Sequence, residues 1–365
     1  MIYFLTPREQ DFGILEFLDY WGRDAECPFS IIHYEDLPDR STLPSGTYVL
    51  SALDQLTPGG LRLVRETEIQ LRAPGHGTRV LNSTETTLLR FGLLQELSRN
   101  GLNRHRVVRA TADAGALHFP VFLREENQHT GPLSALLESA DELRAELARA
   151  IVRGYSLTEL LVVEHCDTAD ADRSYRKYAA FVIDSQVVPQ FLSHGRGWLL
   201  DLGRTEFTAA VIEEERSYVE ENPHESELRG IFAVAGTQYG RIDYAVKQGV
   251  IETWEINLNP TLARYPSLSP ELDLLRRPTT ELFHRRFLAA FRAVDAGGAG
   301  SHSIPIHFSP DSLRASDRMI RRAHRSRIPS AVARAARPVR PLVDSIIKFL
   351  SPIIVRAANR PGSAR

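Results

Sequence analysis

The sequence predicts a protein of mixed α/β and α+β class, with two or three packed units and a helical, basic C-terminal tail. Three observations predict this class. The 365 residues are 43% hydrophobic and 25% charged, which is enough for more than one hydrophobic core. Apolar runs with strand spacing alternate with runs of helical spacing along most of the chain. Residues 297–365 are instead rich in Arg, Ala and Pro and show no such sustained pattern.

The composition excludes several classes of protein. No apolar run approaches the roughly 18 residues that a membrane-spanning helix needs. The first five residues lack the basic start and the cleavage site of a signal peptide. Cys27 and Cys166 are the two cysteines, too few for a disulfide framework or a thiolate metal cage. A cytoplasmic location is therefore expected.

The charges are unevenly distributed along the chain. The 44 basic and 46 acidic residues nearly balance, yet from Arg314 onward there are 13 Lys or Arg residues and only Asp317 and Asp344. An acidic body of about −13 thus precedes a tail of about +11. Such a tail favours an anionic partner, either a membrane surface or an acidic protein face. Apolar residues at helical spacing over 342–350 fit a helix on a membrane, but docking on the body or on a partner subunit is favoured. Nucleic acid is not expected as a partner, because the Arg residues lack interleaved aromatic side chains.

The first domain is expected over residues 1–78. Strands at 2–5, 30–34 and 48–50 and a helix at 12–18 suggest a small α/β unit with a parallel sheet. The turn-rich segment 72–77 reads as its boundary.

The second domain is expected over residues 79–265. Ser83 or Thr84 can cap a helix whose apolar face includes Leu93 and Leu97, and Gly101 stands where that helix should end. Further strands are expected at 119–124, 160–163, 178–183 and 186–189, and further helices at 133–154, 205–222 and 225–238. A helix at 271–294, within a third segment 266–296, should pack on the body, and 297–365 should be a linker and the basic tail.

Residues 240–260 are the most informative stretch, because they form two period-two strands around a turn at 247–249. Alternation puts Arg241 and Asp243 on one side of the first strand, and Glu255 and Asn257 on one side of the second. Antiparallel pairing would join the two rows. Asp243, Glu255 and Asn257 would then offer hard oxygen ligands to one Mg²⁺ ion. Arg241 would stabilise a developing oxyanion or a phosphate. An ordinary hairpin with a polar face explains the same spacing.

The segments Gly240-Arg241-Ile242-Asp243 and Glu255-Ile256-Asn257-Leu258-Asn259-Pro260 closely resemble the metal-binding hairpin of the ATP-grasp superfamily. The resemblance covers about half of the chain, roughly from Val80 to Tyr265. It implies a two-lobed ATP-grasp fold over 79–265, preceded by a pre-ATP-grasp-like α/β domain. It also implies ATP and Mg²⁺ as cofactors.

The resemblance implies nucleotide contacts upstream of the hairpin. Arg90 and Arg124 stand where the family usually carries Lys to bind phosphate, and they keep the charge. Backbone groups near Glu164, His165 and Cys166 would hold adenine. Asp167 would bind the ribose, and Lys177 would face the nucleotide. The loop at 125–131 contains one Gly where the family often has a glycine-rich cover, and its His129 reads as a phosphate contact or as a solvated side chain.

The reaction implied by this resemblance joins a carboxylate to an amine. A small-molecule or peptide carboxylate would attack the γ-phosphoryl group of ATP, and the resulting acylphosphate would react with an amine. Arg241 would act as the catalytic residue. Two alternatives stay open: an ATP-binding scaffold without catalysis, and a kinase that transfers phosphate to a hydroxyl.

Overall fold

The computed structural model describes residues 1–22, 29–113, 115, 117–129, 131–262, 268–295 and 302–321. The chain divides into two compact units. The first combines Met1–Leu89 with Asp167–Arg321, and the second is Arg90–Cys166. The mixed α/β class is confirmed by sheets of both parallel and antiparallel strands. In the described part of the chain, no helix has both the length and the apolar character needed to cross a bilayer.

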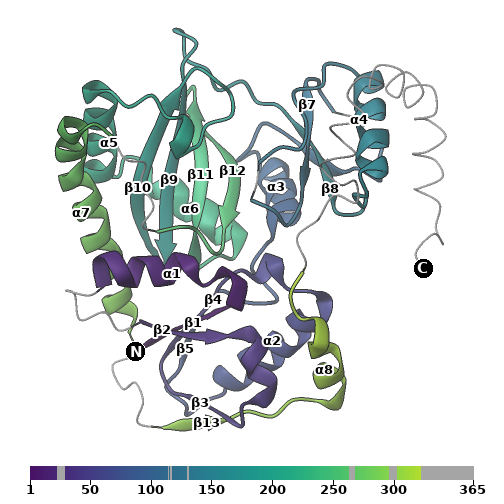
Figure 1. Cartoon of the computed structure of the whole chain (residues 1–365), viewed down its shortest axis with the longest axis vertical. Coiled ribbons are helices and arrows are strands. Elements are labelled where there is room, and N and C mark those ends of the chain that lie inside the picture. Colours follow the sequence, from purple (N-terminus) through teal and green to yellow (C-terminus); the bar gives the residue numbers. More distant parts are fainter. Residues whose placement is uncertain are drawn as a thin grey trace. The chain divides into compact units, whose positions relative to one another are not determined.

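A parallel four-stranded sheet opens the first unit (Figure 1). Its strands, in spatial order, are β2 (Phe29–His33), β1 (Ile2–Thr6), β4 (Thr47–Leu50) and β5 (Arg79–Leu81). Helices α1 (Phe12–Phe17) and α2 (Pro58–Leu71) belong to the same region. The expected strands and the first helix are confirmed. The sequence pattern assigns the residues of β5 to the start of the second domain, but this strand pairs with β4 and completes the first sheet.

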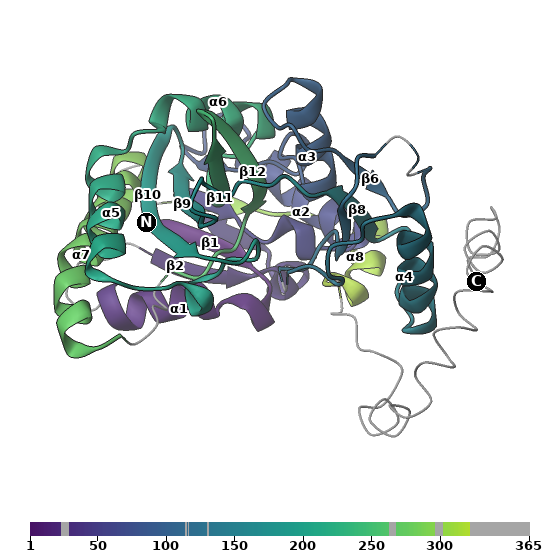
Figure 2. The same ribbon diagram turned by 90° about the horizontal axis from the view of Figure 1, so that it is seen from above.

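An antiparallel sheet also lies in the first unit. Its order is β10 (Gln186–Gly195), β9 (Tyr175–Ile183), β11 (Tyr239–Lys247) and β12 (Val250–Asn257). The helices of this part are α5 (Ala209–Glu221), α6 (Glu225–Ala235) and α7 (Pro270–Val294). Figures 1 and 2 show α5 and α7 beside β10. The predicted hairpin and all three helices are therefore present, although α5 and α6 are shorter than their periodicity suggests.

An aromatic core joins α7 to both sheets of the first unit. Phe283, Phe287 and Phe291 recur every four residues, so they share one face of α7. All three are fully buried and belong to a cluster that includes Phe4 of β1 and Phe181 of β9. Because each large aromatic side chain buries 150–250 Å² or so, this seam stabilises the position of the antiparallel sheet.

The second unit is a small antiparallel sheet with two helices. The strand order is β6 (Val107–Arg109), β8 (Leu160–Glu164) and β7 (Val121–Glu125), and the helices are α3 (Arg90–Arg99) and α4 (Ala140–Val152). The predicted cap of α3 at Ser83 or Thr84 is wrong, since α3 begins at Arg90. α4 also begins later than expected, because Ser139 caps it by accepting the Glu142 N–H.

Residues 302–321 differ from the expected linker and tail. Strand β13 (Ser303–Pro305) pairs with β3 (Thr42–Pro44), and helix α8 (Pro310–Ala315) packs against α2. A Cβ on Gly60 of α2 would lie 2.4 Å from the carbonyl oxygen of Met319, so this packing needs a glycine. The local pattern does not mark this contact, because it depends on partners far away in the sequence: Ser309 and Ser312 donate to the Glu66 carboxylate, and the Thr57 N–H donates to the Met319 carbonyl. The amphipathic stretch 342–350 lies outside the described residues.

Short helical turns complete the first unit. The 3-10 turns are Arg8–Gln10, Tyr34–Asp39, Leu53–Gln55, Leu202–Arg204 and Ser316–Arg318, and a π-helical turn spans Leu18–Gly22.

Candidate functional site

The hairpin of β11 and β12 brings the predicted polar rows together. Arg241 pairs directly with Asn257, and Asp243 pairs directly with Glu255. The turn between the strands consists of Gln248 and Gly249, both with positive φ, the geometry that suits a two-residue hairpin loop. The prediction that these four side chains share one face of the sheet is therefore confirmed.

A β-bulge follows the Asp243 pair. Tyr244 pairs with Thr253, so Trp254 is an extra residue on β12. Because of this residue, Glu252 and Glu255 lie on the same face, although strict alternation would separate them. Glu252 is fully buried and pairs with Ala245, one position beyond Asp243 on that face. Sequence reasoning missed this carboxylate, because nothing in the local pattern marks a bulge.

Asp243 is the centre of the site. It is 4% exposed, and each of its carboxylate oxygens accepts a charged donor. Oδ1 accepts from Arg241 Nε at 2.9 Å, and Oδ2 accepts from Lys177 Nζ at 3.0 Å. Lys177 reaches it from β9, where Ala179 pairs with Asp243 and so places Lys177 on the same face.

The surrounding charges set the ionisation of this carboxyl. Burial by itself would raise the pKa of Asp243, and Glu255 acts in the same direction. Arg241 and then Lys177 outweigh both, so the pKa lies below the ordinary value. Asp243 is therefore a carboxylate at neutral pH.

Arg241 is held in place by several weaker contacts. Its guanidinium lies 5.3 Å from the ring centroid of Phe191, a cation–π arrangement. Its Nη1 donates to Gln190 Oε1 and to the Thr261 carbonyl, each at 3.4 Å. These contacts hold the Arg241 guanidinium beside Asp243.

The donor set fits a magnesium ion. Asp243 and Glu255 supply two carboxylates on opposed positions, and Asn257 supplies an amide oxygen that also accepts the Asn259 N–H at 2.8 Å. Hard oxygen donors of this kind suit Mg²⁺, which usually keeps several water or phosphate ligands. No group of three or more His, Cys, Asp or Glu side chains among the described residues, these included, could hold a metal, so the set depends on the amide of Asn257 as its third ligand.

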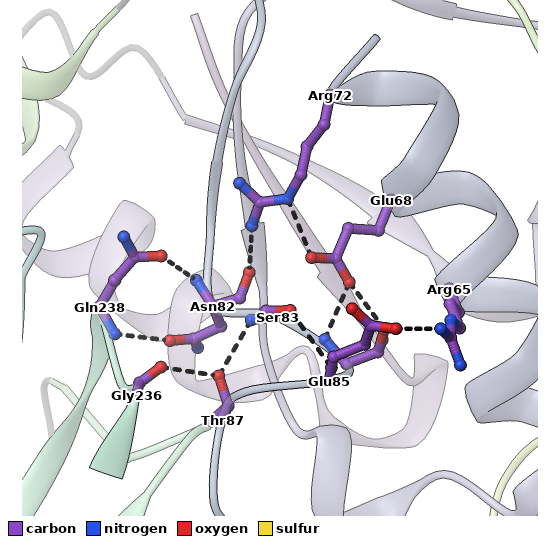
Figure 3. A network of polar contacts seen from close by, with 10 residues as sticks. Arg65, Glu68, Arg72, Asn82, Ser83, Glu85, Thr87, Gly236 and Gln238 are labelled. Carbon is purple, nitrogen blue, oxygen red and sulfur yellow. Dashed lines mark hydrogen bonds and ion pairs between the residues drawn. The ribbon is translucent and has the colours of Figure 1, made fainter. Parts of the chain in front are cut away.

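Asn82 connects the parallel sheet to the start of β11 (Figure 3). It is fully buried with φ of 65°, a left-handed conformation that Asn tolerates. Its Nδ2 donates to the carbonyls of Leu50 and Tyr239 at 3.0 and 2.8 Å. Its Oδ1 accepts the N–H groups of Gln238 and Tyr239, each at 2.9 Å. This side chain therefore anchors the strand that carries Arg241 and Asp243, a role that the sequence alone did not reveal.

A cavity of about 670 Å³ adjoins the Asn82 network. It is lined by Glu68, Arg72, Ser83, Glu85, Thr86, Val182, Asp184, Ser185, Arg229, Phe232, Ala233, Gly236, Thr237 and Gln238. Val182 lies on the opposite face of β9 from Lys177, so this cavity is distinct from the Asp243 site. Arg72 already donates to Glu68 and to the Asn82 carbonyl, as Figure 3 shows.

Arg90 organises a loop within the second unit. It is 6% exposed, and its Nη1 donates to the carbonyls of Glu125, Glu126 and Gln128 at 3.1, 2.7 and 2.6 Å. Its Nη2 lies 3.2 Å from His129 Nδ1. Glu126 forms a fork with Arg109, at 2.6 and 3.1 Å. Arg124, the other predicted phosphate contact, is buried on β7.

The end of β8 carries the predicted adenine contacts. Glu164 is buried and accepts from the side chain of Arg106 at 2.7 and 3.0 Å and from the His118 N–H at 2.6 Å. Burial would raise the pKa of Glu164, but hydrogen bonds, above all those from the Arg106 side chain, outweigh burial and hold this pKa below its ordinary value. The N–H of His165 donates to the Pro120 carbonyl. These two residues therefore brace the small sheet, and Cys166 follows, half-buried.

Asp167, the predicted ribose contact, opens the next segment of the first unit. Its Oδ1 accepts from the Tyr175 hydroxyl at 2.9 Å and from the Ala169 N–H at 3.0 Å. The structure thus assembles five of the predicted residues into one cluster: Lys177, Arg241, Asp243, Glu255 and Asn257. Asp167 lies elsewhere in the same unit, and Arg90, Arg124, Glu164, His165 and Cys166 belong to the second unit.

Comparisons with known proteins give structural neighbours only. No family model matches the chain, and no curated protein matches its sequence. A crystal structure of D-alanine–D-alanine ligase from Bacillus anthracis complexed with ATP aligns over 80% of this chain and 98% of that one, with 13% identity and a TM-score of 0.44. A second structure of the ligase from that organism has 13% identity and a TM-score of 0.45, over 80% of this chain and 97% of that one. The D-alanine–D-alanine ligase from Coxiella burnetii has 9% identity and a TM-score of 0.45, over 80% of this chain and 98% of that one.

Proposed function

We propose that this protein is an ATP-grasp-type ligase that joins a carboxylate to an amine at the expense of ATP, with Mg²⁺. The observation that carries the proposal is the cross-strand register that sets Asp243 against Glu255 and Arg241 against Asn257. The Arg-x-Asp and Glu-x-Asn spacing that resembles the ATP-grasp hairpin therefore coincides with a physical cluster. A merely solvated polar face would not bury Asp243 between two cations.

The residues have separate tasks in the proposed reaction. Asp243, Glu255 and Asn257 would hold Mg²⁺, which when bound supplies positive charge against the phosphate oxygens of ATP. Lys177 and Arg241 would bind phosphate oxygens, since both present N–H donors on the same face. Arg124, the Glu164–Cys166 segment and Asp167 remain proposed nucleotide contacts.

The proposed reaction has two steps. An oxygen of the substrate carboxylate attacks the γ-phosphorus, the bond to the β-γ bridging oxygen breaks, and ADP leaves. The amine then attacks the acyl carbon, loses a proton, and phosphate leaves with the former carboxylate oxygen. Arg241 would neutralise the oxyanion of the tetrahedral step. The protein mainly orients the reactants and excludes water.

A scaffold that binds nucleotide without catalysis is the second candidate, and one observation favours it. The Arg90 guanidinium donates to backbone carbonyls of the loop after β7, whereas binding a phosphate would require the same N–H donors. Such a protein would bind ATP and release no ADP.

The deciding experiment is a titration of ATP by calorimetry, with and without Mg²⁺, followed by a single-turnover assay for ADP release with mixed carboxylates and amines. Asp243→Asn should abolish the dependence of ATP binding on Mg²⁺. Glu213→Gln, an exposed change on α5, serves as the control. Identical, magnesium-independent ATP binding by the native chain and Asp243→Asn would refute the metal assignment. Phosphorylated product without amide would identify a kinase instead.

A further inference from the structure

We propose that Lys177 and Arg241 together lock the metal-binding carboxylate of Asp243, so that metal and nucleotide bind with strong mutual cooperativity. The proposal rests on the proposed function and describes how its site is controlled. A divalent ion alone would find its principal ligand occupied, and a polyphosphate would release that ligand by drawing both cations away.

The lock is visible in the hydrogen bonds of Asp243. Both oxygens of the carboxylate carry a charged partner, at 2.9 Å from Arg241 and 3.0 Å from Lys177. The side chains of Asp243, Arg241 and Lys177 are 6%, 13% and 17% exposed, so water screens these pairs poorly. Charge-assisted hydrogen bonds in such surroundings are among the stronger polar contacts in proteins.

The charge balance explains why a metal ion alone should bind weakly. The charged groups that act on Asp243 are the cations Arg241 and Lys177 and the carboxylate Glu255. Together with Asp243 they are formally neutral, and the buried Glu252 on the same face leaves one negative charge in excess, a weak attraction for a divalent cation whose principal ligand is already paired. An entering ion would also displace the Lys177 ammonium and Nε of Arg241 from the Asp243 carboxylate at a site that water reaches poorly, which is unfavourable.

A polyphosphate removes this obstacle because it supplies new acceptors. Lys177 is a flexible point charge, and Arg241 is a planar fork, and both suit phosphate oxygens. Once they turn to the phosphate, the carboxylate of Asp243 is released to the metal. Each ligand thus removes the obstacle that the other would meet. By linkage, the coupling is reciprocal, and typical couplings change affinity about 5- to 150-fold.

The test uses Mn²⁺ as a spectroscopic metal and a non-hydrolysable ATP analogue with an imido bridge. Mn²⁺ binding to the full-length chain is measured by electron paramagnetic resonance, with and without the analogue. We expect the analogue to tighten Mn²⁺ binding at least about 5-fold. In Lys177→Met, Mn²⁺ alone should bind more tightly than in the native chain, while the analogue alone should bind more weakly, and the coupling factor should shrink.

Opposite changes in the two affinities, tighter for Mn²⁺ and weaker for the analogue, distinguish the lock from damage to the fold, because damage would weaken the binding of both ligands. Lys177→Gln, which keeps a donor without the charge, gives a second variant that should move in the same directions. The matched control is Arg176→Met, since Arg176 is the neighbouring cation on β9 but pairs with Glu214 and Asp170. It should leave the coupling factor unchanged.

The outcomes are distinct. If the native chain binds Mn²⁺ and the analogue independently, the lock and the metal assignment of the proposed function are both wrong. If the two ligands are coupled but Lys177→Met leaves the coupling factor unchanged, the lock alone is wrong and the proposed function stands. The lock is also wrong if Lys177→Met and Lys177→Gln leave the affinity for Mn²⁺ alone unchanged or weaker. If the native chain binds neither probe under any condition, the lock and the proposed function fall together.

Discussion

Replacement of Asn82 by glycine should be strongly destabilising, because one buried side chain satisfies four backbone groups. These are the carbonyls of Leu50 and Tyr239 and the N–H groups of Gln238 and Tyr239. A lost hydrogen bond of this kind costs about 1 kcal/mol or more when its partner stays buried, so Asn82→Gly should cost about 4 kcal/mol. Glycine is chosen because it accepts the left-handed φ of 65° without strain.

Asn222→Gly is the matched control for this experiment. Asn222 also has a left-handed φ, of 49°, but it is partly exposed, and its Nδ2 donates to the Val187 carbonyl and to Glu225. Its replacement should cost about 1 kcal/mol, and the greater flexibility of glycine in the unfolded chain affects both variants equally.

Urea unfolding followed by circular dichroism measures the difference between the two variants. We expect Asn82→Gly to be less stable than Asn222→Gly by about 3 kcal/mol. Equal losses would show that the Asn82 side chain does not anchor β11, and the reasoning from its four hydrogen bonds would be refuted.

Three further predictions follow from the structure. Gly60→Ala should displace the 302–321 segment, because the new Cβ would lie 2.4 Å from the Met319 carbonyl; faster limited proteolysis of that segment is expected, whereas Gly230→Ala, which meets nothing within 4 Å, should be neutral or stabilising by up to about 1 kcal/mol. His284 should make the protein acid-sensitive, because burial outweighs the carbonyls of Thr280 and Leu262 and lowers its pKa to about 4. Below pH 6.5, the ordinary pKa of histidine, His284 binds a proton in the unfolded chain but not in the folded one. The free energy of unfolding is therefore highest above pH 6.5 and falls by about 3 kcal/mol as the pH approaches 4. Urea unfolding across this range should show this fall, and the same fall in His284→Gln would contradict the assignment. Arg90→Met should loosen the loop at 125–129, because three carbonyls lose their donor; unchanged hydrogen exchange of that loop would disprove this role.

The candidate site is predictable from the sequence wherever the contacts are local. The period-two pattern of 240–260 predicts an antiparallel hairpin with Arg241 and Asp243 in one row and Glu255 and Asn257 in another. The two-residue Gln248-Gly249 turn by itself would oppose Asp243 to Trp254, and the bulge at Trp254 brings Glu255 opposite Asp243. The local pattern therefore names the two rows, whereas the bulge decides that they share one face.

Helix starts and the C-terminal segment were less predictable, because tertiary partners compete with local propensity. Thr84 is a reasonable helix cap by its residue type. In the structure its N–H and hydroxyl instead donate to Glu68 at 2.8 and 2.7 Å, and α3 starts six residues later. Residues 302–321 carry a tail-like composition, yet backbone pairing of β13 with β3 and packing on α2 give them a defined place.

By itself, then, the sequence determined the mixed fold class, the hairpin and the two rows of polar side chains on it, since these depend on residues within about twenty positions of one another. Only the tertiary structure decided which cationic side chains pair with Asp243, because Lys177 lies 66 positions away and is brought to Asp243 by the pairing of β9 with β11. The bulge that aligns Glu255 with Asp243, the anchoring by Asn82 and the contacts of Arg90 with a loop were decided in the same way. Each depends on packing between distant segments, whose free energy no local pattern encodes.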